Sequence, residues 1–298
     1  MADFHPQRVL CPTDMSEIAG AAVRCGLAWA ARFHAKAFVL MARELTLPPR
    51  YFTSEQVAAL TRQADEVEEQ VRSDLASWVK SLDAGGVPFE TVVGPGPADR
   101  AILRAIHVIK PDLVVMGTHG RSGYNRFLMG STAEKVIRQI STPTLVIREG
   151  CRRLVRGAPA AGRLEIRRIL CAADDSKFTG TSVAVVAELA RSFGADVIAL
   201  HVLETPKWLS GGVGAARERA TRRLTDHVAA HAADLRVNIL VREGPAYQKI
   251  LDCALEEEAD LIVVGGRQTE GEYPVFGSTA LRVMRHAACP VLALPGRT

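Results

Sequence analysis

The segment from residue 117 to residue 132 combines glycines, hydroxyl groups and basic side chains at a spacing suited to phosphate binding. It follows an apolar run and contains Gly117, Gly120 and Gly130, with Ser131 and Thr132 at its end. Glycine permits positive φ angles and lets backbone amides approach a ligand closely, and consecutive amides can form an anion-binding nest. A helix that begins near Ser131 would add its free N–H groups. The segment therefore predicts a site for a phosphorylated ligand.

Two arginines and a histidine of this segment could serve the same ligand. Arg121 and Arg126 supply positive charge for phosphate oxygens. His119 is a potential acid–base group, but the sequence places no carboxylate or nucleophile beside it, so a binding role is favoured. The segment lacks the Gly-Lys-Ser/Thr of a Walker A loop and the GxGxxG fingerprint of dinucleotide-binding turns. Neither of those two common phosphate sites is predicted.

Several of these residues also have a purely structural interpretation. Ser131 and Glu134 have the spacing of a capping box, in which the serine caps a helix. Asp14 precedes Ser16 and could cap the first helix of the chain. The glycines could serve a tight turn without any ligand. Both interpretations of Ser131 can hold together, because a cap hydroxyl lies beside free amides.

An internal repeat shows that the elements around this segment occur twice. Four segments recur in the same order, namely residues 8–11 and 168–171, 96–98 and 244–246, 112–117 and 260–265, and 130–133 and 277–280. Repetition over this length indicates two related domains. The first half carries about a dozen additional residues, which we place in a proline-containing loop at 45–53. The segment 149–162 lacks periodicity and indicates a linker.

Each half alternates short apolar strands with amphipathic helices. In the first half we expect strands at 8–11, 37–42, 89–93, 113–117 and 144–147. The long helix after the second strand has a stripe that we expect to be buried, formed by Val57, Leu60, Ala64, Val67, Val71, Leu75, Trp78 and Leu82. Continuous apolar strands between helices predict an α/β fold with a doubly wound parallel sheet in each half. Ligands of such sheets bind at the carboxyl ends of the strands.

The bulk composition excludes several classes of protein. The chain is 48% hydrophobic and 23% charged with a net charge of +4, which is ordinary for a globular protein. Its basic residues form no stripe, so no nucleic-acid partner is expected. We find neither an apolar run of roughly 18 residues nor a signal-peptide core, and we therefore expect no membrane association and a cytoplasmic location. The six cysteines form no CxxC pair, which fits reduced, buried thiols.

The glycine pattern resembles the ATP-binding signature of the universal stress protein family. In that signature a glycine, two residues, a second glycine, nine residues and Gly-Ser follow one another, and Gly117, Gly120, Gly130 and Ser131 match each position. The run from residue 9 to residue 16, with its Asp14, is similar to the first strand of that family. The resemblance covers nearly the whole chain, twice.

This resemblance implies a set of nucleotide-binding residues. Pro12, Thr13 and Asp14 would line the adenosine end, and Ala42 would form a wall for the adenine. The ribose and phosphates would lie along Met116, Gly117, His119, Gly120 and Arg121. Gly130, Ser131 and Thr132 would hold the phosphates. The ligand implied is ATP, and whether Mg²⁺ accompanies it stays open. No catalytic residue is implied.

The resemblance also implies a tandem architecture. An ATP-binding domain would span residues 1–148, a linker 149–165, and a second domain with a degenerate nucleotide loop 166–298. Two five-stranded, Rossmann-like sheets would pair through their fifth strands across a pseudo-twofold axis within one chain. A stress-response role through ATP binding is expected, with a homodimer and an unidentified protein partner. A slow ATPase or phosphotransferase, and an assembly scaffold without nucleotide, are the alternatives.

The corresponding loop of the second half departs from the signature. Gln268 stands at the second glycine position, and the loop is one residue shorter. Glu270 and Glu272 place negative charge where phosphates favour cations, although solvent screens part of it. We expect a preserved fold with weak or absent ATP binding, and a different ligand held by Arg267 is the alternative. The matching residues that remain are Asp174, Gly265, Gly277, Ser278 and Thr279.

Three histidines outside the loop have simpler interpretations than catalysis. His227 and His231 lie one helical turn apart and could bind a metal, but no third ligand is identifiable, so a solvated helix surface is favoured. His201 ends a strand and is expected in the core or in a pocket wall. Any metal site therefore stays unknown at this stage.

Overall fold

The computed structural model describes residues 4–43, 53–82, 86–118, 129–150, 154–156, 163–174, 179–204, 213–266 and 276–296. Within these ranges, the first half alternates five strands with four helices. They are β1 (Arg8–Thr13), α1 (Glu17–Phe33), β2 (Lys36–Arg43), α2 (Ser54–Ser81), β3 (Phe89–Pro95), α3 (Ala98–Ile109), β4 (Leu113–Gly117), α4 (Ser131–Ile137) and β5 (Thr144–Ile147).

The second half repeats this order. Its elements are β8 (Arg168–Ala173), α5 (Thr179–Phe193), β9 (Asp196–Leu203), α6 (Val213–His231), β10 (Val237–Glu243), α7 (Ala246–Glu256), β11 (Leu261–Gly265), α8 (Ser278–His286) and β12 (Val291–Leu294). Between the halves, β6 (Val155–Arg156) and β7 (Arg163–Leu164) pair as a short antiparallel ribbon. The segment that we expected to be a plain linker therefore contains local backbone pairing.

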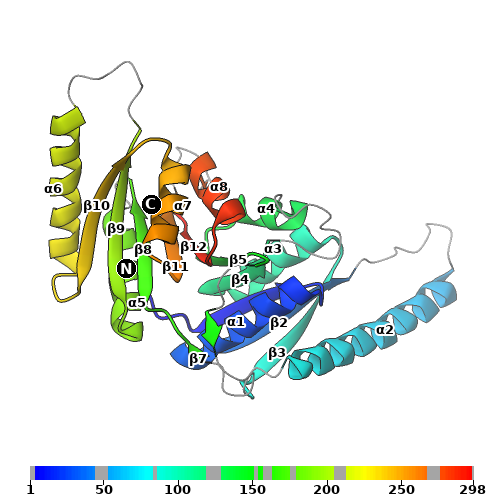
Figure 1. Ribbon diagram of the computed structural model, residues 1–298. Coiled ribbons are helices and arrows are strands. Elements are labelled where there is room, and N and C mark those ends of the chain that lie inside the picture. Colours follow the sequence, from blue (N-terminus) through cyan, green and yellow to red (C-terminus); the bar gives the residue numbers. More distant parts are fainter. Residues whose placement is uncertain are drawn as a thin grey trace.

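One ten-stranded sheet runs through both halves. Its strand order is β10-β9-β8-β11-β12-β5-β4-β1-β2-β3. Neighbours within each half are parallel, whereas β12 and β5 are antiparallel, with Leu292 opposite Leu145. Figure 1 shows this sheet running from β10 to β3 with helices on both faces. The α/β fold and the doubly wound topology predicted from the sequence are confirmed, and the two fifth strands join the two halves.

The core forms two layers, one on each face of the sheet. One layer packs residues of α1 and α5 against the strands, including Trp29, Phe33 and Leu189. The other packs residues of α3, α4, α7 and α8 against the opposite face, including Val136 and Met284. Both layers contain residues of both halves, so the junction at β5 and β12 lies inside a continuous core.

A repeated carboxylate fixes the start of the first strand in each half. Asp112 precedes β4, and its Oδ2 accepts hydrogen bonds from the backbone amides of residues 7–8, both at 2.9 Å. Asp260 precedes β11 and accepts from the amides of residues 167–168 at 2.8 and 3.1 Å. The two aspartates belong to the sequence repeat, and the structure assigns them this structural role.

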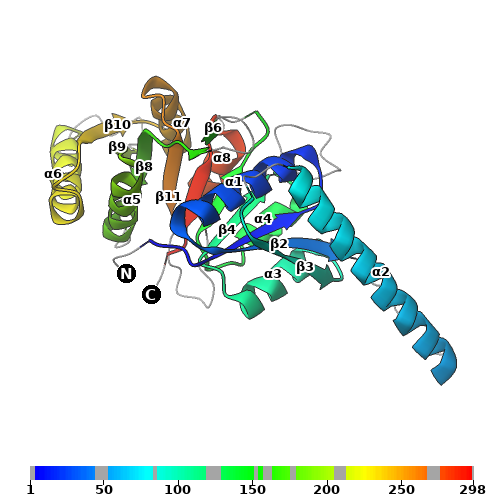
Figure 2. The same ribbon diagram turned by 90° about the horizontal axis from the view of Figure 1, so that it is seen from below.

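The long helix α2 differs from our expectation. We expected an apolar stripe from Val57 to Leu82 to be buried, but of its residues only Leu75 is buried, while Trp78 and Leu82 pack partly buried against the core. Val79, which was not in the predicted stripe, is also buried. Val57, Leu60 and Val67 are exposed. Figure 2 shows why, because the first turns of α2 extend past the edge of the sheet. No helix within the described ranges is long and apolar enough to cross a membrane.

Candidate functional site

A cavity of about 310 Å³ opens at the carboxyl ends of β1, β2 and β4. The first turns of α3 and α4 close its other sides. Its described lining residues are Pro12, Thr13, Asp14, Ala19, Leu40, Ala42, Ala98, Ile102, Met116, Gly117, Thr118, Gly130, Ser131, Thr132 and Ala133. The volume is at the lower end for ligand pockets, and the mixture of apolar walls with a few polar groups is typical of them.

Nine of the twelve residues implied by the family resemblance line this cavity. They come from the ends of three strands and from the start of α4. The other three, His119, Gly120 and Arg121, lie outside the described residues, as does Arg126. The structure also adds lining residues that the sequence did not suggest, chiefly Leu40, Ile102 and Thr118.

The polar end of the cavity at β1 is held in place by local hydrogen bonds. The backbone amide of Met15 donates to Thr13 Oγ1 at 2.9 Å, and the amide of Ser16 donates to Asp14 Oδ1 at 3.0 Å. Met15 has a φ of 61°, so the chain turns sharply between β1 and α1. Ser16 then caps α1 by accepting from the amide of Ala19 at 3.3 Å. Asp14 therefore supports the cap of α1 while its carboxylate lines the cavity.

The start of α4 corrects our capping-box interpretation of Ser131. Gly130 is the N-cap residue, and Ser131 is the first residue of the helix. The backbone amide of Gly130 donates to the carbonyl of Thr118 at 2.6 Å, which ties the two ends of the glycine loop together. Glu134 does not reach back to the cap, because its carboxylate binds two arginines instead.

Glu134 connects this side of the first half to the second half. Its Oε1 accepts from Arg138 at 2.8 Å, and its Oε2 accepts from Arg285 of α8 at 2.8 Å. The hydrogen bond from Arg138, together with the charge and hydrogen bond of Arg285, holds the pKa of Glu134 below its ordinary value. The carboxylate therefore stays ionised near neutral pH and links the two domains.

The second half has bulkier or differently bonded residues at equivalent positions. Val202 occupies the position of Ala42, and Phe276, which is fully buried, occupies the position of Met129. Asp174, the counterpart of Asp14, accepts a hydrogen bond from Thr179 Oγ1 at 3.3 Å. The sequence repeat shows that the second half has a valine where the first half has Ala42. That this position lines a ligand pocket becomes clear only from the alignment of the strands.

His201 lies in the wall of a small second cavity, which agrees with our expectation. It is buried, and its Nδ1 is 3.0 Å from the carbonyl oxygen of Ala173, to which an Nδ1–H donates. The cavity measures about 40 Å³ and also contacts His227 and Asp174. Of the two α6 histidines, His227 is half-buried and His231 is exposed. Within the described residues, no three histidine, cysteine or acidic side chains are placed to hold a metal ion.

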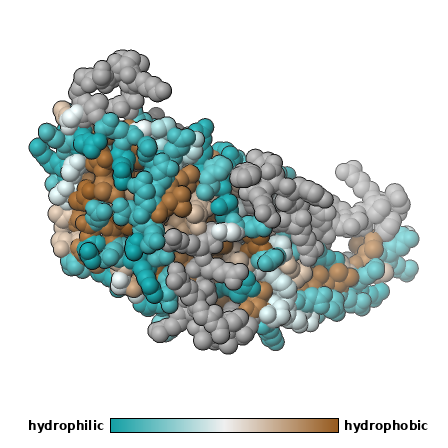
Figure 3. All heavy atoms as spheres, viewed as in Figure 1, coloured by the Kyte–Doolittle hydropathy of each residue, from teal (hydrophilic) through white to brown (hydrophobic). Residues whose placement is uncertain are grey.

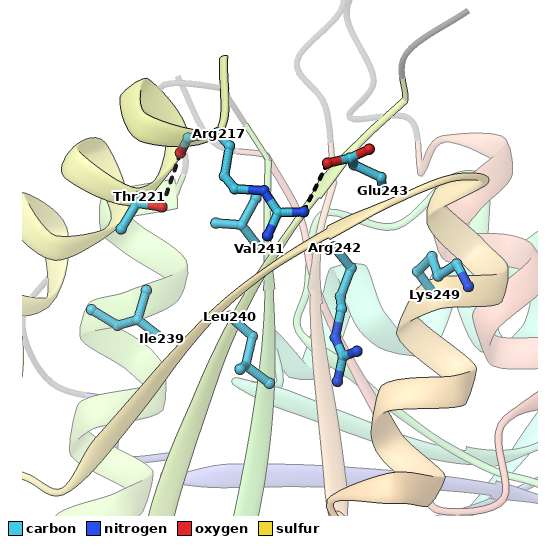
Figure 4. A pocket seen from close by; sticks show the side chains of 8 residues that line it. All are labelled: Arg217, Thr221, Ile239, Leu240, Val241, Arg242, Glu243 and Lys249. Carbon is cyan, nitrogen blue, oxygen red and sulfur yellow. Dashed lines mark hydrogen bonds and ion pairs between the residues drawn. The ribbon is translucent and has the colours of Figure 1, made fainter. Parts of the chain in front are cut away.

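A third hollow lies at the outer edge of the sheet, between α6, β10 and α7. Figure 4 shows its lining side chains, with Arg217 directed toward Glu243 at 2.7 Å. Arg242 is also paired, with Glu256 at 2.9 Å. Lys249 lies 3.6 Å from Asp252. Because its cations are already neutralised by carboxylates, this hollow lacks the charge that a phosphate site requires.

Comparison with known proteins identifies relatives of each half. The model of the universal stress protein family matches residues 6–148 and again residues 165–295. A universal stress protein of Thermus aquaticus is 34% identical over 134 residues, covering 42% of this chain and 96% of that protein. A universal stress protein of Methanocaldococcus jannaschii is 26% identical over 147 residues, covering 48% of this chain and 82% of that protein.

Solved structures reproduce the whole two-domain arrangement. A universal stress protein from Archaeoglobus fulgidus superposes with a TM-score of 0.66 at 20% identity, covering 97% of this chain and 98% of that one. A functionally unknown protein from Pseudomonas aeruginosa gives a TM-score of 0.64 at 16% identity, covering 98% and 94% of the two chains. At these identities the likeness concerns the fold.

Proposed function

Because the chain belongs to the universal stress protein family, with two of the family's domains in tandem, we propose that it is a regulatory nucleotide-binding protein whose first domain binds ATP. The observation that carries this proposal is the cavity at the strand ends of the first half, around which most residues of the glycine signature gather. A cavity at the carboxyl ends of a doubly wound sheet is where ligands of this fold class bind.

The chemistry of the cavity fits the two ends of an adenine nucleotide. Leu40, Ala42 and Ile102 form an apolar wall on which a flat base can pack. Asp14, at the same end, offers carboxylate oxygens to ribose hydroxyls or to an exocyclic amine. The hydroxyls of Ser131 and Thr132 lie at the other side and can donate to phosphate oxygens.

The rest of the phosphate grip would come from His119, Gly120 and Arg121, which lie outside the described residues. In this proposal their backbone amides and the guanidinium neutralise the phosphates, so that the described cavity holds mainly the nucleoside. No described residue is placed as a catalytic base, and the proposed role is binding without turnover. A site for accompanying Mg²⁺ is not part of the proposal.

We propose that the second domain has lost this function. Val202 narrows the position of the adenine wall, and the acidic residues Glu270 and Glu272 in its loop disfavour phosphates. A stoichiometry of one ATP per chain follows. The second domain then serves mainly as the permanent partner of the first through β5 and β12.

Isothermal titration calorimetry with ATP tests the proposal. The wild-type protein should bind one equivalent, and Ala42→Leu should weaken binding at least tenfold by filling the adenine wall. Val202→Leu, at the same strand position in the second domain, is the matched control and should leave binding unchanged. An absence of ATP binding would refute the proposal, and two equivalents would refute the assignment to the first domain alone.

A parallel measurement of phosphate release separates binding from catalysis. The binding role predicts that ATP is retained over hours with negligible phosphate release. Steady release that Ala42→Leu abolishes would favour the slow ATPase instead. A cytoplasmic location and an additional protein partner stay predictions of the sequence.

A further inference from the structure

The first part of α2 carries an apolar row that the described part of the chain leaves uncovered. Val57, Leu60 and Val67 are 39%, 37% and 42% exposed, although each is a large aliphatic residue. Ala64 and Val71 continue the same row and are partly exposed. We call these five residues the α2 stripe. Figure 3 shows apolar surface along this helix, on the side of the molecule remote from α6.

The spacing of the α2 stripe is that of a helix–helix seam. Its residues follow one another at intervals of three, four, three and four, which is the a/d pattern of a coiled coil. A helix that covers the core of its own domain usually has a broader apolar face. The counterpart α6 buries Ala220 and Leu224 in its own domain, so the uncovered row is peculiar to α2.

The residues beside the stripe suit a partner with the same sequence. One flank carries glutamines at 56, 63 and 70, and the other carries Ser54, Thr61 and Glu68. The remaining charged side chains of this part, such as Arg62 and Glu69, lie toward the opposite side of the helix. Charges at the flanks of a coiled coil decide which helices pair, and like charges there repel. Nearly uncharged flanks remove that repulsion between two identical helices.

The projecting turns also need a partner for their own stability. A helix segment of this length is marginal in water unless an apolar face packs against something. Among the described residues, Arg43 of the body reaches these turns, and its Nη1 donates to the carbonyl of Ala64 at 2.8 Å. Beside that hydrogen bond, the side chains of Val57, Leu60 and Val67 stay exposed to water.

We propose that the α2 stripe packs against the α2 stripe of a second copy of this chain, in an antiparallel coiled coil that makes the protein a homodimer. The antiparallel direction follows from the shape of the molecule. The last turns of α2 are packed into their own domain through Leu75 and Val79, so parallel helices would bring two domain bodies into the same space. In the antiparallel arrangement, the bodies lie at opposite ends of a seam about 21 Å long, because the stripe spans residues 57–71 at about 1.5 Å per residue.

Sedimentation velocity of the full chain tests the homodimer. At a concentration on the order of 100 μM, where a complex with a micromolar Kd is almost fully formed, the wild-type protein should sediment as a dimer. The double variant Leu60→Glu, Val67→Glu places charge in the seam and should raise the dimer Kd at least a hundredfold. Both side chains are exposed in the single chain, so the fold should persist, which far-ultraviolet circular dichroism checks.

The matched control places the same two substitutions on the outer side of the same helix. Ala58→Glu, Ala59→Glu alters the charge of α2 equally but lies outside the stripe, and it should remain dimeric. A wild-type protein that stays monomeric at this concentration overturns the proposal. A dimer that persists in Leu60→Glu, Val67→Glu also overturns it, because the contact then lies elsewhere.

Distance measurement between nitroxide labels tests the direction of the helices. A label at Ser54→Cys, on one flank of the stripe, lies at the projecting end of α2. Cys151, which lies outside the described residues, is replaced by serine, and the five described cysteines are buried. Antiparallel pairing centred on Ala64, the middle of the stripe, separates the two labels by about 30 Å along the helices. Parallel pairing would bring them to roughly the 10 Å spacing of packed helices, and that result would overturn the antiparallel arrangement.

Discussion

Gly26 is the position at which one added methyl group should most clearly disturb the first domain. It lies in α1 where the helix crosses β1, and a Cβ there would be 2.2 Å from Cys11 Sγ and 3.3 Å from Val115 Cβ. Cys11 is fully buried in the strand, so its sulfur cannot move aside without displacing other core atoms. Gly26→Ala therefore forces α1 away from the sheet.

The magnitude follows from two opposing effects. Overpacking of a core costs about 1–3 kcal/mol, whereas replacing glycine by alanine inside a helix gains about 1 kcal/mol. A contact as short as 2.2 Å places the cost at the upper end of its range. We expect Gly26→Ala to lower the free energy of unfolding by about 1–2 kcal/mol.

Gly20 provides a control on the same helix with the same substitution. A Cβ at Gly20 would approach the ends of two side chains, Leu82 Cδ2 at 3.3 Å and Trp78 Cζ2 at 3.5 Å, which can adjust. Gly20→Ala should therefore be neutral or raise the stability by up to about 1 kcal/mol.

Urea unfolding followed by circular dichroism measures the free energy of unfolding of both variants and of a double variant designed to relieve the clash. In the double variant Cys11→Ala, Gly26→Ala, the new methyl group occupies space that the sulfur has vacated. The two substitutions should therefore be less destabilising together than the sum of their separate effects. A stability of Gly26→Ala equal to that of Gly20→Ala, or strictly additive effects in the double variant, would show that Gly26 and Cys11 do not clash in this way.

Asp112, Glu134 and two buried cysteines each provide a further test of the fold. Asp112→Ala leaves two strand-start amides without their acceptor and should lower the free energy of unfolding by about 1–3 kcal/mol, measured by urea unfolding against Asp112→Asn. Glu134→Gln should cost up to about 1 kcal/mol at neutral pH. Because the folded-state pKa of Glu134 is lowered, the difference in unfolding free energy between wild type and variant should be present above pH 4.5 and disappear as the pH falls below it. A difference that stays constant over this pH range would contradict the ion pair. Burial raises the pKa of the Cys11 and Cys171 thiols to about 12, so neither should react with iodoacetamide at pH 8 until the protein unfolds, as mass spectrometry can show.

The strands were the part of the fold that the sequence predicted most closely. β4 and β5 begin and end at the predicted residues, because both are short apolar runs with a sharp polar or proline boundary. The pairing of β5 with β12 was implied by the family resemblance and is present. Hydrophobic periodicity failed for α2, because a periodic row defines a face of a helix but does not say what covers that face.

The residues of the candidate site that belong to a sequence motif could be predicted. Those whose contact with the cavity depends on the alignment of neighbouring strands could not. The cavity gathers Asp14, Gly117 and Ser131, three residues that the family resemblance implied, and ligand binding there is a proposal. The cap of α4 was wrong by one residue, because Gly130 and Ser131 are adjacent and spacing alone does not distinguish them. Leu40 was missed as a wall residue, since its contact with the cavity depends on how β2 aligns with β1.

The antiparallel contact between β5 and β12 has a consequence for communication between the halves. Because the two sets of parallel strands run in opposite directions, their carboxyl ends lie on opposite margins of the sheet. A molecule held at one margin cannot touch a molecule held at the other. An influence can travel through the central strands, through the Glu134–Arg285 bridge, or through the packing of Trp29 and Phe33 of α1 against Phe193 of α5. Since both halves share one polypeptide, this path survives dilution that would separate two independent subunits.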